Sequence, residues 1–340
     1  MEHRFIGRSG LMVSALTFGN WLTQGAERDR QVAERCIGAA LDLGITSFDT
    51  ADTYANGAAE ECLGAALKGQ RRSSLVVMSK CFYPAVPAPR GPNEVGLSRK
   101  HIMESINGSL SRLGMDYVDV YMAHRYDRFT PLEETMQAFA DIVRQGKALY
   151  IGVSEWMPEA LREGQALARQ MGFSLISNQS QYSMLWRVIE GEVVPTSQEL
   201  GISQMVWSPM AQGVLSGKYL PGQAAPEGSR ALDTVGGGAQ MISRWLTDEV
   251  LQAVQNLKPV AADLGVSMSQ MALAWVLKNP NVATAVIGAS RPEQLTENVK
   301  AAEIDLSPDV MARIDAILAG VANTDPALTA QFTPAARPGG

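Results

Sequence analysis

The chain has 340 residues, 46% of them hydrophobic, and a formal net charge of −6. This length and composition supply one large hydrophobic core or two ordinary ones. The negative charge and the lack of long Lys/Arg runs argue against nucleic-acid binding. No apolar segment approaches the roughly 18 residues of a transmembrane helix, so no membrane insertion is expected.

The N-terminal segment predicts a β-hairpin. In "MEHRFIGRSGLMVSALTFG" the turn signal "GRSG" precedes an apolar stretch that Ser and Thr interrupt. This pattern favours a hairpin over a secretory signal peptide.

Eight apolar, β-branched runs recur along the chain, and each predicts a strand. Between them lie segments such as "QVAERCIGAALDLG" and "RKHIMESINGSLSRLG", which have apolar residues at helical spacing and end at glycine. The predicted strands cover residues 16–20, 45–50, 75–80, 118–124, 148–154, 175–182, 203–209 and 284–290.

This repeat of strand and helix predicts an α/β protein with a parallel sheet. Eight such units in a single domain, residues 1–320, predict a closed (β/α)8 TIM barrel. A doubly wound open sheet is the alternative. It is disfavoured because no G-x-G-x-x-G follows the first strand.

Two segments depart from the repeat. After the seventh predicted strand, "MAQGVLSGKYLPGQAAPEGSRALDTVGGGAQ" is rich in Gly, Pro and Ala and predicts a long functional loop. The C-terminal segment, residues 321–340, has a similar bias, and we expect it to be flexible.

The cysteines are Cys36, Cys62 and Cys81, an odd number without metal-ligand spacing. We therefore expect reduced thiols in the core of a cytoplasmic protein, and no metal site.

Four complementary side chains lie at consecutive predicted strand ends. Asp49 closes the second strand, Tyr54 lies in the loop after it, Lys80 closes the third strand and His124 closes the fourth. In a barrel the carboxyl ends of all strands open onto one face, where active sites form. Taken singly, Asp49 fits a turn cap, Lys80 a snorkelling side chain and His124 an interior histidine. Their occurrence together favours a functional site.

These residue types suit delivery of a proton to a carbonyl oxygen. A free phenol has a pKa near 10, and a neighbouring ammonium is expected to lower the pKa of Tyr54 toward the working range. Asp49 would pair with Lys80 and orient it, and His124 would donate a hydrogen bond to the oxygen as negative charge builds there. We therefore expect Asp49 and Tyr54 both to reach Lys80.

At these four positions the chain resembles the aldo-keto reductases, which use an Asp/Tyr/Lys/His tetrad in a (β/α)8 barrel. The likeness runs from "GRSGLMVSALTFGNW" to "GASRPEQLTEN". "GLSRKHI", "SRLGMDYVDV", "PLEETM" and "WSPMAQGVLSGKY" resemble the branch of voltage-gated potassium channel β subunits and their bacterial relatives.

The chain departs from that branch at two places. The channel subunits have Asn where this chain has His124, and histidine favours an active reductase. They also have Ser-Arg-Trp where residues 154–156 read "SEW", so Glu155 replaces a cation near the expected nicotinamide.

The stretch "GASRPEQLTEN" predicts an anion site at the start of a helix. Ser290 has the character of an N-cap, Pro292 fits the first turn and Arg291 adds positive charge. An ordinary helix cap is the alternative. The resemblance implies that this site holds the adenosine end of NADPH, and the extra 2′-phosphate leads us to expect preference for NADPH over NADH.

The resemblance implies further cofactor contacts along the chain. At the adenosine end these are Gly288, Ser290, Arg291, Gln294, Glu297 and Asn298. In the long loop, Lys218 and Arg230 would clamp the phosphates. After the seventh strand the contacts are Trp207, Ser208, Pro209, Met210, Ala211 and Gln212. At the nicotinamide end they are Trp21, Asp49, Ser154 and Gln179. Tyr83, Trp21 and Trp156 are candidates for the wall of the substrate pocket.

The leading interpretation is an NADPH-dependent reductase of aldehydes and ketones, with Tyr54 as the general acid. The alternative is a slow-turnover, NADPH-binding redox sensor that acts as a partner of a membrane channel or transporter. A barrel without catalysis ranks last, because it leaves the four strand-end residues unexplained. The resemblance also implies a homo-oligomer, a tetramer or larger.

Overall fold

Eight parallel strands form a closed barrel in the computed structural model, which describes residues 1–21, 27–87, 91–234 and 237–336. The barrel closes because the last strand pairs with both the first and the seventh, with Ile287 opposite Phe18 and Val286 opposite Trp207. The predicted (β/α)8 fold is confirmed, and the open sheet is wrong. The strands in order around the barrel are β3 Leu16–Gly19, β4 Ser47–Asp49, β5 Val76–Cys81, β6 Val118–Ala123, β7 Ala148–Ser154, β8 Leu175–Gln181, β9 Ser203–Trp207 and β10 Val282–Ile287.

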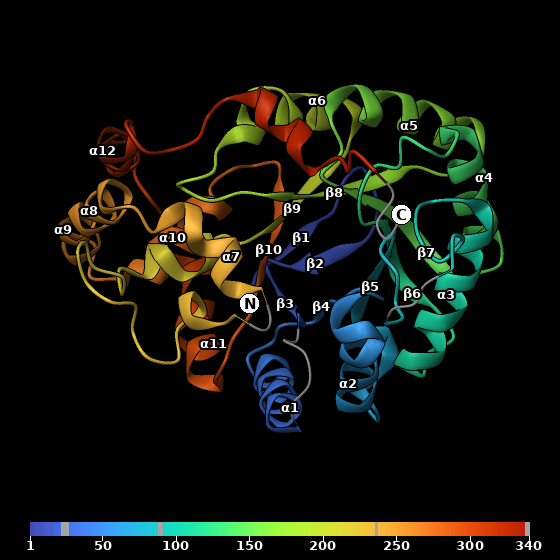
Figure 1. Ribbon diagram of the computed structural model, residues 1–340, viewed down its shortest axis with the longest axis horizontal. Coiled ribbons are helices and arrows are strands. Elements are labelled where there is room, and N and C mark those ends of the chain that lie inside the picture. The colour runs from blue at the N-terminus through green and yellow to red at the C-terminus, as the bar shows by residue number, and fades with distance from the viewer. Residues whose placement is uncertain (22–26, 88–90, 235–236, 337–340) are drawn as a thin grey trace.

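The predicted hairpin precedes the barrel and lies across one end of it (Figure 1). Strands β1 His3–Phe5 and β2 Met12–Ser14 pair antiparallel. Ile6 and Val13 are fully buried and pack in one cluster with inward-facing barrel residues such as Met78. The hairpin therefore closes the amino-terminal end of the barrel and leaves the carboxyl ends of the strands for the site.

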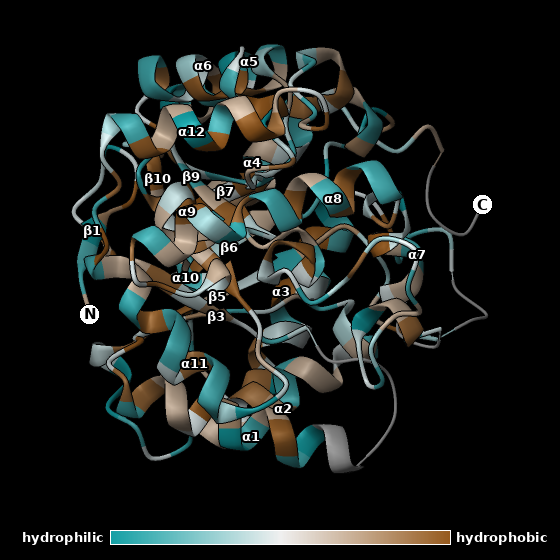
Figure 2. Cartoon of the chain, turned by 90° about the vertical axis from the view of Figure 1, so that its left-hand side faces the viewer, coloured by the Kyte–Doolittle hydropathy of each residue, from teal (hydrophilic) through white to brown (hydrophobic). Residues whose placement is uncertain are grey.

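Helices surround the barrel, as Figure 1 shows. In Figure 2 hydrophobic and hydrophilic residues alternate along them, as helices with one buried face require. In the part of the chain that the structure describes, they are α1 Glu27–Asp42, α2 Ala58–Leu67, α3 Arg99–Leu113, α4 Leu132–Arg144, α5 Pro158–Gln170, α6 Val193–Leu200, α7 Gly238–Ile242, α8 Asp248–Asn256, α9 Lys258–Asp263, α10 Met268–Leu277, α11 Pro292–Asn298 and α12 Pro308–Leu318.

Local signals set the helix ends. In α3 the hydroxyl of Ser98 accepts a hydrogen bond from the amide of His101, and Gly114 ends the helix at φ 64°. In α4 the first turn carries Glu133 and Glu134 and the last turn Arg144, which complements the helix dipole.

The long connection after β9 has more structure than the predicted loop. It contains the 3-10 helices Ala211–Ser216, Arg230–Leu232 and Ser243–Trp245 as well as α7. The side chains of Leu215 and Trp245 are buried, and they anchor the connection to the core. Composition alone did not reveal Leu215, which stands between Gly213 and Gly217, and Trp245 lies beyond the stretch predicted as the loop.

Part of the C-terminal segment, residues 321–340, which the sequence predicts to be flexible, contacts the rest of the chain. Asn323 exchanges backbone hydrogen bonds with Leu185 and Arg187, and a 3-10 helix spans Pro326–Phe332. The ring of Phe332 packs edge-on against Trp186 and Trp207. One aromatic anchor therefore holds a segment whose overall composition resembles that of a disordered tail. Residues 337–340 lie outside the described residues.

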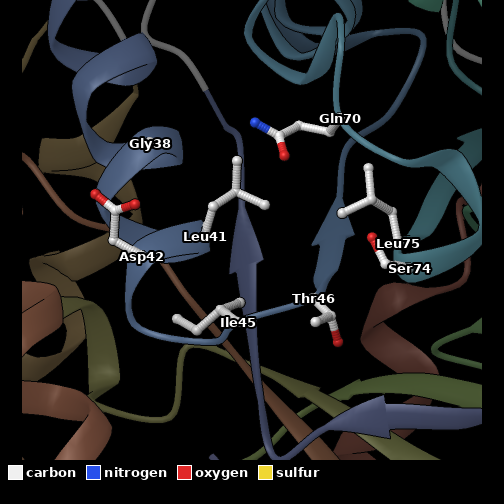
Figure 3. A pocket seen from close by; sticks show the side chains of 8 residues that line it. All are labelled: Gly38, Leu41, Asp42, Ile45, Thr46, Gln70, Ser74 and Leu75. Atoms are coloured by element: carbon white, nitrogen blue, oxygen red, sulfur yellow. The ribbon is translucent and has the colours of Figure 1, made fainter.

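Two cavities lie at the base of the barrel, away from the carboxyl ends. One of about 350 Å³ lies beneath the starts of β4 and β5, where Leu41, Thr46 and Gln70 line it (Figure 3). The other, of about 430 Å³, lies beside the hairpin. No single helix in the described ranges has both the length and the apolar character to cross a membrane. Only the bent combination of Asp248–Asp263 and Met268–Leu277 meets that standard.

Candidate active site

The four strand-end residues converge at the carboxyl end of the barrel. Asp49 is the last residue of β4, Lys80 is the next to last of β5, and His124 follows β6 directly. Tyr54 begins a 3-10 helix, Tyr54–Gly57, after β4. Because these strands are neighbours in the barrel, side chains that are 75 residues apart in sequence meet on one face.

Lys80 is at the centre of the site and is fully buried. Its Nζ donates to Asp49 Oδ2 at 2.7 Å, to the carbonyl oxygen of Thr50 at 2.7 Å and to Tyr54 Oη at 3.3 Å. An ammonium has three N–H donors, so all of them have acceptors. Asp49 and Tyr54 therefore both contact Lys80, as the sequence predicted.

Burial and charge act in opposite directions on this pair. Burial lowers the pKa of Lys80, but Asp49 and then Tyr54 outweigh it, so the net pKa is raised and the amine stays charged. Burial raises the pKa of Tyr54, and Lys80 offsets only part of this increase. The predicted net fall in the Tyr54 pKa is therefore wrong. Desolvation of the phenolate exceeds the stabilisation that Lys80 provides.

His124 lies against the rings of two tyrosines. Its ring is edge-on to Tyr54 at 5.7 Å and to Tyr83 at 5.3 Å between centroids. Burial, and then the charges of Arg125 and Lys80, hold the pKa of His124 well below its usual value. The imidazole is therefore neutral at pH 7 and can donate one hydrogen bond.

A second hydrogen-bond chain supports Asp49 from the other side of the barrel. The side-chain amide of Gln179 donates to Asp49 Oδ1 at 2.8 Å, and the hydroxyl of Ser154 donates to the carbonyl oxygen of Gln179 at 2.8 Å. Ser154 and Gln179, predicted at the nicotinamide end, are thus connected to the Asp49–Lys80 pair. With both carboxylate oxygens bonded, Asp49 has a fixed orientation.

Glu155 follows β7 with φ 56° and is 2% exposed. Its Oε1 accepts from the backbone amide of Gln181 at 2.6 Å and from Trp207 Nε1 at 2.7 Å. Burial raises the pKa of this carboxyl to about 7, although Arg125 lowers it. Glu155 therefore positions Trp207 at the end of β9.

Backbone strain concentrates around this site. In the described part of the chain, the residues other than glycine with positive φ are Ala55 and Asn56 after β4, Glu155 after β7, and Ser208, Ala211 and Gln212 after β9. Such conformations cost of order 1–3 kcal/mol each and cluster at functional sites. After β9, Gln212 donates to Ser208 Oγ and accepts from Trp245 Nε1, which fixes the strained turn that also contains Pro209 and Met210.

The remaining predicted cofactor residues lie after β9 and β10. Arg230 lies over the ring of Trp21 at 5.2 Å, while Lys218 is exposed. Gly288 follows β10 and is exposed.

The cap of α11 was predicted wrongly. Arg291 is the N-cap of α11, and both the amide and the hydroxyl of Ser290 donate to Gln294 Oε1. Asn298 is buried at the end of α11, and Glu297 accepts from Gln270.

The segments after β9 and β10 carry side chains that fit a nucleotide with several phosphates. Lys218, Arg230 and Arg291 supply three cations, and Ser208, Ser290 and Gln294 supply neutral polar groups beside them. Gly213, in the turn before Lys218, has φ 97°, a left-handed backbone conformation that favours glycine.

Comparison with known proteins assigns the chain to a family. The model of the Aldo/keto reductase family matches residues 15–319.

The chain belongs to the aldo/keto reductase family.

Relatives of this aldo/keto reductase include proteins named as potassium channel subunits. A putative voltage-gated potassium channel subunit beta of Schizosaccharomyces pombe is 44% identical and covers 93% of this chain and 92% of its own. Probable voltage-gated potassium channel subunits beta of Oryza sativa subsp. japonica and Arabidopsis thaliana are 41% and 42% identical. Each covers 94% of this chain and 97% of its own.

Two residues beside the candidate site were not identified from the sequence. Arg125 follows His124, and its charge at a strand end was a usable signal. Phe332 had no local signal, because only the tertiary fold brings the C-terminal segment to β9. Of the predicted pocket walls, Tyr83 contacts His124, whereas Trp156 is fully buried against Tyr126 and belongs to the core.

Proposed function

We propose that this aldo/keto reductase uses NADPH to reduce aldehydes and ketones to alcohols, with Tyr54 as the general acid. The observation that carries the proposal is the position of Lys80 Nζ, which contacts both Asp49 Oδ2 and Tyr54 Oη beside His124. When bound, NADPH supplies the hydride that adds to the carbonyl carbon.

The residues of the chain supply the proton and stabilise the charge. Tyr54 gives its hydroxyl proton to the carbonyl oxygen as the C–O π bond breaks, which completes the alcohol and leaves a phenolate. Lys80 stabilises this phenolate because its ammonium already lies 3.3 Å from the oxygen. Neutral His124 donates a hydrogen bond to the developing oxyanion, and Asp49 keeps Lys80 charged and oriented.

The same proposal assigns the cofactor contacts. Trp21, Asp49, Ser154 and Gln179 would hold the nicotinamide end, and Lys218 and Arg230 the phosphates. The turn Trp207–Gln212 lies between them, and Gly288, Ser290, Arg291, Gln294, Glu297 and Asn298 would hold the adenosine end. A cytoplasmic location is supported by Cys36, Cys62 and Cys81, which are buried free thiols. Assembly into a tetramer or larger homo-oligomer is part of the proposal on the basis of the family resemblance.

Catalytic turnover tests the function directly. With 4-nitrobenzaldehyde and NADPH in excess over enzyme, we expect many equivalents of NADPH to be oxidised per active site, followed at 340 nm, with the alcohol identified by chromatography. A reaction that stops after one equivalent, with tight NADPH binding, would contradict the reductase proposal.

A reaction that stops after one equivalent of NADPH would support a different function. The relatives from Oryza sativa, Schizosaccharomyces pombe and Arabidopsis thaliana are named as channel subunits, which favours a channel partner. In this alternative the protein would bind NADPH, turn over slowly and act as a redox sensor. We rank it second because His124 is the histidine that the reductase tetrad requires.

Cofactor preference tests the role of the cations. We expect NADPH to bind at least tenfold more tightly than NADH, because one charge-assisted contact to the 2′-phosphate contributes about 1.5–3 kcal/mol. Quenching of tryptophan fluorescence gives both dissociation constants. R291A should reduce the preference, whereas R313A should not, because Arg313 pairs with Asp263 outside this site. Equal affinities of the wild type for both nucleotides would contradict a contact between these cations and the 2′-phosphate.

A further inference from the structure

Arg125 places a cation next to the proposed reaction site. It follows His124, so the two Cα atoms are about 3.8 Å apart. Its Nη1 donates to the carbonyl oxygen of His124 at 2.5 Å and lies 3.4 Å from Ser154 Oγ. The guanidinium lies 5.8 Å from the ring centre of Tyr83 and 5.9 Å from that of Phe332. Two aromatic rings from distant segments therefore flank it.

The charge of Arg125 has no carboxylate partner in the described part of the chain. Two other partly buried arginines do: Arg72 pairs with Asp119 at 2.7 Å, and Arg112 with Glu60 at 2.7 Å. No carboxylate oxygen among the described residues lies within 4.0 Å of a nitrogen of Arg125. A partly desolvated cation without a paired carboxylate is costly to maintain, and this favours a role in binding an anion.

Glu155 is the carboxylate expected to neutralise Arg125, but its Oε1 is already engaged. That oxygen accepts from Gln181 and Trp207, which hold the carboxylate toward β8 and β9. Glu155 and Arg125 are near enough for the charge of Arg125 to lower the Glu155 pKa, yet they form no ion pair within 4.0 Å.

The free edge of Arg125 suits a carboxylate. Both hydrogen bonds that it makes to described residues use Nη1, so Nε and Nη2 remain available as a two-donor fork. Such a fork binds the two oxygens of a carboxylate side by side. The ring of Tyr83 contacts both the His124 ring, at 5.3 Å, and the guanidinium, so a substrate beside Tyr83 can meet both groups.

We propose that Arg125 forms a carboxylate-binding subsite, and that the preferred substrates are carbonyl compounds that also carry a carboxylate. This inference rests on the proposed reductase function and specifies its substrate class. Arg125 binds the carboxylate, and His124 and Tyr54 act on the carbonyl oxygen. The rings of Tyr83 and Phe332 form the apolar walls that flank the guanidinium.

A matched pair of aldehydes tests the subsite. 4-Carboxybenzaldehyde and methyl 4-formylbenzoate have the same reacting group and differ in one negative charge. For the wild type we expect kcat/KM to be at least tenfold higher for the acid than for the ester. R125Q should lower this ratio at least tenfold, mainly through the KM of the acid, because the contact is equally strong in the ground and transition states. R125K should retain part of the preference, since it keeps the charge but loses the fork.

Arg128→Gln is the matched control, because Arg128 is an exposed arginine of the same loop. Its ratio should equal that of the wild type. If the wild type reduces both aldehydes and R125Q leaves the ratio unchanged, the subsite is overturned while the reductase function stands.

A binding measurement separates the subsite from catalysis. Calorimetric titration of the NADPH-loaded protein with benzoate should give a dissociation constant at least tenfold weaker for R125Q than for the wild type. Equal benzoate affinities would overturn the subsite whether or not any aldehyde is reduced. Failure to reduce either aldehyde overturns the proposed function and the substrate class together.

Discussion

Replacing Tyr54 by phenylalanine is expected to lower kcat for aldehyde reduction by at least a hundredfold, while the dissociation constant of NADPH changes by less than about twofold. The substitution removes one oxygen, the proposed proton donor, and loss of a general acid typically costs 10²–10⁴-fold. The ring that contacts His124 is retained. Single-turnover kinetics with 4-nitrobenzaldehyde measures the effect on the chemical step.

The same change at Tyr117, which lies over Arg72 away from the site, should leave kcat unchanged. If Tyr54→Phe keeps more than a tenth of the wild-type rate, a barrier change of less than about 1.4 kcal/mol, Tyr54 is not the essential acid.

The pH dependence follows from the direction of two pKa shifts. Reduction requires protonated Tyr54, and its pKa is raised above 10, so the acid form persists through neutral and mildly alkaline pH. The pKa of His124 is lowered well below 6.5, so the imidazole stays neutral over the same range. We therefore expect a flat kcat profile between about pH 7 and 9 and a fall only at higher pH. A fall centred near pH 7 would contradict this assignment.

Lys80→Met is expected to affect both activity and folding stability. It removes the cation that stabilises the phenolate, so reduction should fall at least as far as in Tyr54→Phe. It also leaves the carboxylate of Asp49 buried beside Gln179 without its counter-charge. Breaking a buried pair in this way costs about 3–5 kcal/mol of unfolding free energy, which urea denaturation measures.

The stability loss comes from one buried charge. Without Lys80, the carboxylate of Asp49 is buried with no cation beside it, whereas in the unfolded chain water solvates it. The double variant D49N/K80M should recover much of the stability, because no unpaired charge remains, but none of the activity.

An exposed ion pair provides the comparison. Lys278 and Asp305 form such a pair on the surface, and Lys278→Met should cost less than about 1 kcal/mol. A cost for Lys80→Met no larger than this would show that the Asp49–Lys80 pair is not the buried, desolvated contact described above.

Local patterns determined the elements of this fold. The strand-helix repeat predicted eight barrel strands with ends within three residues of those observed, because apolar runs, helix caps and glycine stops act over a few residues. Residue type alone did not locate every helix start correctly. Ser290 has the residue type of a helix cap, yet its hydroxyl bonds to Gln294 one turn later.

For the site, the sequence by itself determined which side chains are available: Asp49, Lys80 and His124 occur at strand ends that the barrel directs to one face, and Tyr54 lies in the loop after one of them. Only the tertiary structure decided how they interact. The net rise in the Tyr54 pKa depends on how much protein surrounds the phenol, and the position of Phe332 depends on a segment that returns to β9 from the far end of the chain. Desolvation and long-range packing are properties of the assembled barrel, because they sum over neighbours that are distant in sequence.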